Sequence, residues 1–409
     1  NGEEKRTFAR IIHKMRTLDT ANFSNKKVLI RVDFNVPLDE NKRVTDHTRI
    51  KAAKPTIDKV LAEGGSCVLM THLGRPKGVD DKLSLRHIVS EIQKVLGVDV
   101  QFSKDTIGPG AEAKAQALQP GQVMLLENLR FYDEETKGDE QFANALSALA
   151  DCYINDAFGT AHRAHASTTI VAQFFPKAKY FGYLLAQEID AIDRVMSTGE
   201  KPVLAVLGGA KVSSKITIIE NILDKVDHLI IGGGMSFTFA KAMGGQIGNS
   251  ICEDDKQELA LSILSSAKEK GVQIHLPTDV VAGDQFSNEA NQQIFPIDQI
   301  PDGWEGMDAG PESLAAFREV VLKSRTILWN GPLGVFEFSR FSQGTIALGE
   351  AISASTKNGA FSLVGGGDSV AAVKQFNMEN EVSYVSTGGG AMLESLEGKT
   401  LPGIAAIMA

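Results

Sequence analysis

Basic side chains follow several apolar runs in the first half of the sequence. The run "CVLM" at 67–70 leads directly into "THLGRPKG", which places His72 and Arg75 at the end of a predicted buried strand. Similar positions are held by Asp33 and Asn35 in "RVDFNVP", Asn128 and Arg130 in "LLENLRFY", His162, Arg163 and His165 in "NDAFGTAHRAHAS", and Arg49 at the start of a helix. Arginine presents a planar fork of donors that matches phosphate and carboxylate. Because the carboxyl ends of parallel strands converge, these residues indicate a site for a small anion with at least one phosphate.

A single arginine at a strand end is more often a surface or ion-pair residue, so the prediction depends on the whole set. Asp33 and Asn35 would recognise an uncharged group of the same ligand, such as a hydroxyl.

Glycine marks the strand ends in the second half. The segments are "LGGAKVSSK" (207–215), "IGGGMSFTF" (231–239), "WNGPLGVFE" (329–337), "VGGGDSVAA" (364–372) and "STGGGAMLE" (386–394). Glycine allows a backbone to approach a ligand closely, and a helix start then directs N–H groups at phosphate. Lys211 and Lys215 follow the first of these turns and could reach phosphate oxygens. Asp368 suits either Mg²⁺ or the N-cap of a helix, and the sequence leaves both roles open.

Familiar nucleotide and hydrolase motifs are missing from the sequence. There is no GxxxxGK[ST], no GxGxxG after a strand, no GxSxG and no HExxH. A two-domain α/β dehydrogenase is therefore disfavoured. A phosphorylated anion in one half and a Mg-nucleotide in the other indicate phosphoryl transfer, which depends on positioning and charge neutralisation.

Composition excludes several other classes. The chain has 409 residues, 43% hydrophobic and 23% charged, with a formal net charge of −9. That balance argues against a nucleic-acid or membrane-surface protein. The three cysteines include no CxxC pair, which argues against a disulfide framework or zinc site and suits a reducing compartment. No apolar run is long enough for a membrane helix.

Short apolar runs alternate with helical patterns along most of the chain, which predicts an α/β fold with two Rossmann-like domains, their parallel sheets covered by helices on both faces. The predicted strands are 27–34, 66–72, 122–128, 202–208, 228–233, 272–277, 326–331, 360–366 and 382–387. Helices are predicted over 49–65, with Gly64 as its cap, and over 254–271. The segment 180–202 is predicted to form one long helix followed by a glycine-containing turn and a new strand, and this helix is expected to join the domains.

The first fourteen residues differ in character from the rest. Their basic and apolar residues suggest a transit peptide, but Glu3 and Glu4 oppose that interpretation. We expect Met15 to be the natural start, and we treat 1–14 as an extension whose status stays open.

Nine segments, read together, identify a resemblance to a known family. They are "RVDFNVPL", "THLGRPKG", "LLENLRF", "AHRAHAS", "GGAKVSSKI", "IGGGMSFTF", "WNGPLGVFE", "GGGDSVAA" and "STGGGAMLE". The segments occur in the same order as in the phosphoglycerate kinases, which the chain resembles from about residue 17 to the end. The resemblance implies reversible transfer of the acyl phosphate of 1,3-bisphosphoglycerate to ADP in glycolysis, giving 3-phosphoglycerate and ATP, by direct in-line transfer on hinge closure.

The resemblance also implies residue roles. The phosphoglycerate site would comprise Asp33, Asn35, Arg49, His72, Leu73, Gly74, Arg75, Arg130 and Arg163. The nucleotide site would comprise Gly208, Gly209, Lys211, Lys215, Gly232, Gly306, Met307, Asn330, Pro332, Leu333, Val335, Glu337, Gly366, Gly367, Asp368 and Ser369, with Asp368 as the Mg²⁺ ligand and Glu337 on the ribose. Catalysis would involve Arg49, Lys215, Gly366 and Gly389, the last within the Gly388–Gly390 helix start. The segment "VVAGDQF" departs from the common pattern, which affects contacts near Phe286.

Further implications concern organisation. An N-terminal phosphoglycerate-binding domain would cover 15–183, with about 398–409 returning to it, and a C-terminal Mg-nucleotide-binding domain would cover 184–397. A cytoplasmic monomer that binds neither nucleic acid nor membrane is implied. A catalytically silent relative on the same scaffold remains the alternative.

Overall fold

The computed structural model describes residues 17–409, in two compact units. The first unit comprises 17–190 of the described chain together with Thr400–Ala409, and the second comprises Ala191–Lys399. The predictions made for 1–14 and Met15 lie outside the described residues. Within the described range, none of the helices has both the length and the apolar character needed to cross a membrane. The domain assignment by ligand, with its boundary at 183/184, stays a prediction.

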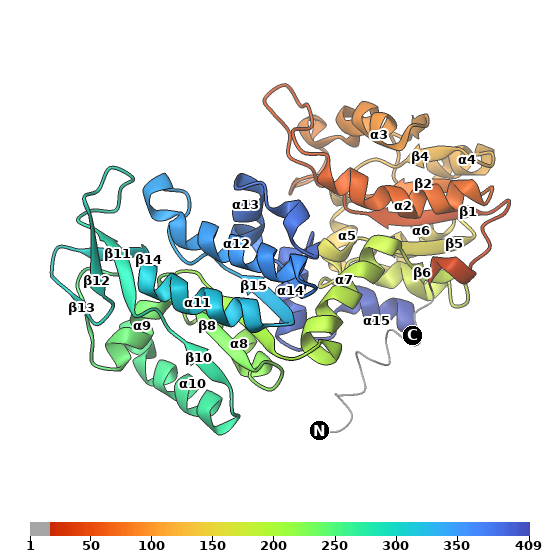
Figure 1. The fold of residues 1–409 in the computed structure, drawn as a ribbon. Coiled ribbons are helices and arrows are strands. Elements are labelled where there is room, and N and C mark those ends of the chain that lie inside the picture. Colours follow the sequence, from red (N-terminus) through yellow and green to blue (C-terminus); the bar gives the residue numbers. More distant parts are fainter. Residues whose placement is uncertain (1–16) are drawn as a thin grey trace. The chain divides into compact units, whose positions relative to one another are not determined.

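The first unit is built on a six-stranded parallel sheet (Figure 1). Its order is β3 (Val100–Phe102), β4 (Val123–Leu125), β2 (Ser66–Met70), β1 (Lys27–Val32), β5 (Cys152–Asp156) and β6 (Lys179–Phe181). In register, Leu29 of β1 lies opposite Val68 of β2 on one side and Tyr153 of β5 on the other. The chain leaves β1 in one direction and returns to β5 on the other side, so the switch point lies between these two strands.

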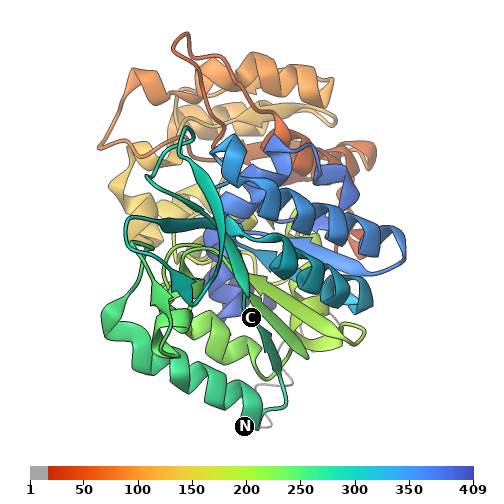
Figure 2. The same cartoon turned by 60° about the vertical axis from the view of Figure 1, so that its left-hand side comes forward.

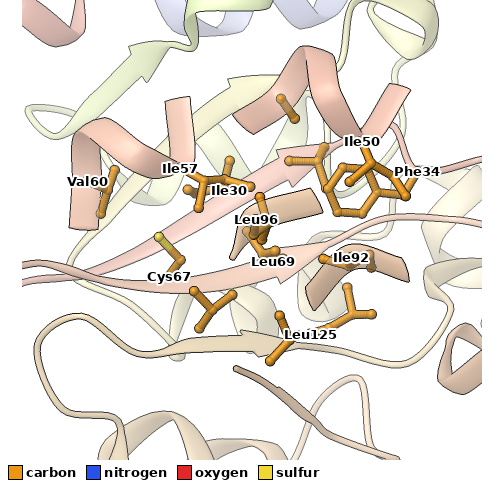
Figure 3. Packing of buried hydrophobic residues seen from close by; sticks show 14 of the residues in the cluster. Ile30, Phe34, Ile50, Ile57, Val60, Cys67, Leu69, Ile92, Leu96 and Leu125 are labelled. Carbon is orange, nitrogen blue, oxygen red and sulfur yellow. The ribbon is translucent and has the colours of Figure 1, made fainter. Parts of the chain in front are cut away.

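Alternating apolar residues bury one face of this sheet against two helices. Ile30, Leu69 and Leu125 point from the strands toward α2 (Thr48–Ala62) and α3 (Val89–Leu96) (Figure 3). Gly64 ends the first of these helices with a φ of +79°, as the sequence predicts. The unit also contains α4 (Pro109–Ala117), α5 (Asp133–Lys137), α6 (Glu140–Ser147) and α15 (Pro402–Met408).

The second unit repeats the architecture. Its parallel sheet has the order β10 (Gln273–His275), β8 (His228–Ile231), β7 (Val203–Leu207), β15 (Thr326–Asn330), β16 (Phe361–Val364) and β17 (Tyr384–Val385). The switch point lies between β7 and β15. Its helices are α8 (Ile216–Ile222), α9 (Met235–Ala242), α10 (Gln257–Glu269), α11 (Pro311–Lys323), α12 (Gln343–Lys357), α13 (Gly367–Gln375) and α14 (Gly389–Leu396). Trp329 of β15 is fully buried among the aliphatic residues of this core.

The predicted fold class is confirmed. The prediction omitted three strands of the first sheet, namely β3, β5 and β6. It also omitted an antiparallel sheet in the second unit, formed by β12 (Gln292–Pro296), β11 (Asp279–Gly283) and β14 (Glu305–Ala309), whose teal strands stand out in Figure 2. A short pair, β9 (Gln246–Ile247) and β13 (Gln299–Ile300), lies in the same unit.

The long helix predicted at the start of the segment 180–202 begins later than expected, and its last turn is not α-helical. Tyr180 and Phe181 belong to β6, α7 spans Tyr183–Asp193, and a π-helical segment follows at Arg194–Thr198. A Cβ atom at Gly182 would lie 2.1 Å from Asp156 Oδ1, so only glycine allows the chain to pass from β6 into the helix here. Apolar periodicity does not reveal that packing constraint.

Candidate active site

The ends of β1, β2, β4 and β5 bring the predicted basic residues of the first unit together. Asp33 directly follows β1 and its carboxylate accepts a hydrogen bond from the Arg49 guanidinium, which comes from the first turn of α2. The Asp33 side chain is 9% exposed and the Arg49 side chain is 35% exposed. The carboxylate therefore orients a cationic group that remains accessible to a ligand.

A network of loop contacts fixes the segments after β1, β2 and β4. Gly74 donates its N–H to Asn35 Oδ1 at 2.8 Å, and its carbonyl accepts from Arg130 Nη1 at 2.8 Å. Asn128 accepts from the N–H of Leu73 at 3.3 Å and donates to the Leu73 carbonyl at 2.9 Å. The side-chain amides thus act as backbone braces, and the guanidinium of Arg130 keeps its remaining donors.

Positive charge accumulates where these segments meet. Burial, together with Arg31, Arg130 and Arg49, lowers the pKa of His72 well below its usual range. Burial and the neighbouring Arg31 lower the pKa of Arg130 to about 10. Burial, again with neighbouring arginines, lowers the pKa of His165 to about 4. Neighbouring arginines thus add to the effect of burial on each of these groups, while Glu135 and Asp33 oppose the shift at Arg130.

Arg163 lies in the segment that follows β5, at the same end of the sheet. Its charge contributes to the lowered pKa values of Arg130 and His165. Its Nε lies 3.2 Å from His162 Nε2. Arg75 is exposed, one residue beyond the braced Gly74.

Three residues of this site were missed in the sequence. Arg31 is fully buried within β1, on the sheet face opposite Ile30, and its Nε donates to Ser167 Oγ at 2.9 Å. Ser167 in turn donates to Glu135 of α5 through both its hydroxyl and its backbone N–H. The sequence does contain a signal for Arg31, because it is a charged residue inside the apolar run "KVLIRV". A charge buried in a strand requires a buried partner.

In the second unit, the strand ends at the switch point pack backbone against backbone. Gly208 follows β7 and donates its N–H to the Asn330 carbonyl at 3.0 Å. A Cβ atom at Gly208 would lie 2.0 Å from the Pro332 carbonyl oxygen. Glycine is therefore required at 208 by packing, whether or not a ligand binds.

A second set of contacts joins β15 to α13 and to the start of α8. Lys215 precedes α8 and donates through Nζ to Asn330 Oδ1, while Asn330 Nδ2 donates to the Gly365 carbonyl at 2.7 Å. Ser369 Oγ accepts from the N–H of Gly331 at 2.5 Å. Burial lowers the pKa of Lys215, and the nearby Asp368 opposes that shift. A cation and a carboxylate thus share one locality, as a metal–polyphosphate ligand requires.

The N-termini of α13 and α14 lie beside each other. A Cβ atom at Gly389, in the first turn of α14, would lie 3.7 Å from the N–H nitrogen of Gly367, the first residue of α13. Gly366, the N-cap of α13, has a φ of +95°. Asp368 is exposed in the first turn of α13. Two helix starts that meet in this way present N–H groups and partial positive charge to the same small volume.

The residues predicted around adenine form two packed groups. A Cβ at Gly232 would lie 2.3 Å from Leu333 Cδ2, and a Cβ at Gly306 would lie 2.1 Å from the Phe237 ring. Val335 donates its N–H to the carbonyl of the buried Met307 at 2.8 Å. The remaining residues predicted for this part of the site are less buried. Lys211, Glu337 and Phe286 are exposed, and Gly209 is half-buried.

The chain thus has two α/β units with parallel sheets, one whose strands end in basic side chains and one whose strands end in glycine-rich helix starts. A family model described as "Phosphoglycerate kinase" matches residues 18–399. The chain is 54% identical to a phosphoglycerate kinase of Porphyromonas gingivalis, over 96% of this chain and 99% of that protein. It is 49% identical to a protein of Nicotiana tabacum named "Phosphoglycerate kinase, cytosolic", over 96% and 97%.

The structure of phosphoglycerate kinase from Coxiella burnetii superposes with a TM-score of 0.89 and 41% identity, covering 96% of this chain and 98% of that one. The chain belongs to the phosphoglycerate kinase family. It is an enzyme of glycolysis that transfers phosphate between 1,3-bisphosphoglycerate and ADP. These matches disfavour both alternatives, a catalytically silent relative and a dehydrogenase.

Proposed function

We propose that the phosphoglycerate half of the reaction takes place at the basic strand ends of the first unit. Asp33 and Asn35 would bind the uncharged hydroxyl, and the anionic groups would lie against the cationic set of Arg49, His72, Arg75, Arg130 and Arg163, near the Leu73–Gly74 backbone. The observation that supports this is the geometry of the strand ends: Asp33 holds Arg49, and Gly74, which lies between His72 and Arg75, contacts both Asn35 and Arg130.

The nucleotide would bind at the glycine-rich strand ends of the second unit. Its phosphates would lie at the N-termini of α13 and α14, near Gly366, Gly367, Ser369 and Gly389. Lys211 and Lys215 would contact phosphate oxygens. Adenine and ribose would be held by Gly208, Gly209, Gly232, Gly306, Met307, Asn330, Pro332, Leu333, Val335 and Glu337. The adjoining helix starts and the partly buried Lys215 support this placement.

Mg²⁺ would be held by Asp368. Among the described residues there is no group of three or more histidine, cysteine or carboxylate side chains suited to a metal. One exposed carboxylate fits Mg²⁺, which usually takes one or two protein carboxylates and completes its shell with substrate phosphates and water. When bound, the ion would neutralise charge on the nucleotide phosphates.

Arg49 would be the main catalytic residue, stabilising charge on the phosphoryl group during transfer, with Lys215 as its counterpart from the second unit. The acceptor carboxylate of 3-phosphoglycerate is ionised at neutral pH, so no general base is needed. Direct in-line transfer requires the two ligands to meet, which we assign to hinge closure. Closure would also keep water from the phosphoryl group.

The test is turnover with 3-phosphoglycerate, Mg²⁺ and ATP, coupled to glyceraldehyde-3-phosphate dehydrogenase and loss of NADH. We expect Arg49→Ala to lower kcat by at least about a thousandfold while ATP binding persists, by analogy with arginines that neutralise a transferring phosphoryl group. Arg318→Ala, on the exposed face of α11, is the matched control and should retain full activity. Equal activity of both variants would contradict the role of Arg49.

The Lys215 role has its own matched pair. Lys215→Ala should raise KM for ATP and lower kcat, whereas Lys323→Ala, whose side chain is 75% exposed at the end of α11, should change neither. We further propose a monomer located in the cytoplasm. The cytosolic tobacco relative supports that location, and sedimentation equilibrium and cell fractionation test the two statements.

A further inference from the structure

Arg31 is a fully buried cation in the middle of β1. A buried guanidinium is costly unless its charge is balanced and its donors are satisfied. Its side chain reaches the loop after β2 that carries His72. The groups that surround Arg31 therefore decide what it can do for that loop.

A bridged ion pair balances its charge. Arg31 Nε donates to Ser167 Oγ at 2.9 Å. Because that oxygen accepts from arginine, its own proton is free to donate to Glu135 Oε1, at 2.6 Å, and the Ser167 N–H donates to Glu135 Oε2 at 2.9 Å. Burial raises the pKa of Glu135, while Arg31 and both Ser167 hydrogen bonds oppose that shift. Ser167 thus joins the guanidinium to the carboxylate.

The other end of the guanidinium contacts His72. Arg31 Nη2 lies 3.1 Å from His72 Nδ1. An arginine side chain has only donors and stays charged in proteins. Nδ1 must therefore present its lone pair, the ring proton must lie on Nε2, and the ring must be neutral. Protonation of Nδ1 would place two donors and two positive charges against each other.

We propose that Arg31 is a positioning residue for catalysis, which holds His72 as the neutral Nε2–H tautomer and so fixes one donor toward an anionic oxygen of phosphoglycerate. This inference rests on the proposed function, in which His72 binds that substrate. The charged and titratable groups that act on His72 are Arg31 of β1, Arg49 of α2, Arg130 after β4 and His165 after β5. Each disfavours the imidazolium, so the ring stays neutral across neutral pH.

The direct test is the protonation state of His72 in the intact protein. Long-range ¹H–¹⁵N correlation spectra distinguish the two ring nitrogens, and the His72→Gln variant identifies their signals. We expect Nε2 to carry the proton and Nδ1 to be bare at every pH from about 6 to 8. A proton on Nδ1, or an imidazolium at neutral pH, would overturn the proposal.

The kinetic test uses the double variant Arg31→Met/Glu135→Gln, which removes both buried charges and leaves neither ion uncompensated. We expect KM for 3-phosphoglycerate to rise about tenfold at pH 8, the loss of one well-placed hydrogen bond to a charged group. KM for ATP should not change. His72 stays buried in the variant, and Arg49 and Arg130 still disfavour its imidazolium, so the increase in KM should be similar at pH 6 and pH 8. In spectra of the variant, the ring proton should no longer be confined to Nε2.

Several outcomes are distinguishable. A folded double variant with wild-type KM would overturn the inference, and a higher KM with the ring proton of His72 still on Nε2 alone would indicate a merely structural role. If the variant does not fold, the wild-type spectra still decide. If the wild-type protein binds no 3-phosphoglycerate, the proposed function fails, whatever the tautomer of His72. Arg318→Met serves as the matched control for the substitution itself.

Discussion

Replacing Asp156 by asparagine should make the stability of the first unit less dependent on pH. Asp156 ends β5, is fully buried, and accepts a hydrogen bond through Oδ1 from the Leu185 N–H at 3.2 Å, in the first turn of α7. Its Oδ2 is buried without a hydrogen-bond partner among the described residues. Burial raises the pKa of this carboxyl to about 7, although Thr56 and the α7 backbone oppose the shift.

The sign and size follow from linkage between protonation and folding. The ordinary value is 3.8, so the shift is about three pH units, and each unit corresponds to about 1.4 kcal/mol. Between about pH 4 and 7 the folded chain retains a proton that the unfolded chain releases. Raising the pH through that window therefore lowers the free energy of unfolding, by at most about 4 kcal/mol from this residue.

The asparagine side chain of the variant cannot ionise, but its amide oxygen can still accept from Leu185. Its NH₂ group would occupy the position of Oδ2 and lose about 1–3 kcal/mol as an unpaired buried donor. We expect Asp156→Asn to be less stable than the wild type near pH 4.5 and about 1–3 kcal/mol more stable at pH 8, where only the wild type must bury a charge.

The assay is urea unfolding at several pH values, followed by far-UV circular dichroism and by hydrogen exchange in peptides of the first unit. Both tryptophans, Trp304 and Trp329, lie in the second unit, so their fluorescence reports that unit separately. Asp133→Asn, at a side chain that is 76% exposed, is the matched control. Equal pH slopes for Asp156→Asn and the wild type, with the variant destabilised at pH 8, would refute the reasoning and identify an ionised helix cap.

Three further predictions can be checked with simple variants or reagents. Burial likewise raises the pKa of Asp308 in β14 to about 7, so Asp308→Asn should lessen the loss of tryptophan-reported stability between pH 5 and 8; a variant that keeps the wild-type slope would contradict this. Gly366→Ala should abolish turnover, because its Cβ would lie 2.4 Å from Asn330 Nδ2 at a φ of +95°, whereas Gly359→Ala, at +94° in open space, should cost about 1 kcal/mol in stability and leave kcat unchanged. Of the three thiols only Cys252 is not buried, so one thiol per native chain should react quickly with a disulfide reagent and three in guanidinium; fast reaction of a second native thiol would argue against the packing around β1.

The alternation of strands and helices, and the chemical character of each strand end, could be predicted from the amino-acid sequence alone. The run "CVLM" before "THLGRP", and the glycine triplets before α13 and α14, could be interpreted because a buried parallel strand is a continuous apolar run and its end is polar. The fold class followed from those patterns. The particular roles of the site residues came from the resemblance, and they remain proposals.

The contacts that hold the residues at those strand ends in place could be seen only in the folded chain. Arg31 looked like one charge in an apolar strand, and its connection to Ser167, Glu135 and His72 spans residues more than a hundred positions apart. Gly182 looked like a helical residue until Asp156 occupied the space beside it. Local periodicity reports which face of an element is buried, but a hydrogen-bond partner or a steric limit from a distant segment is set by packing. For that reason the sequence indicated where a ligand would bind, and the folded chain determined which proton His72 can offer to it.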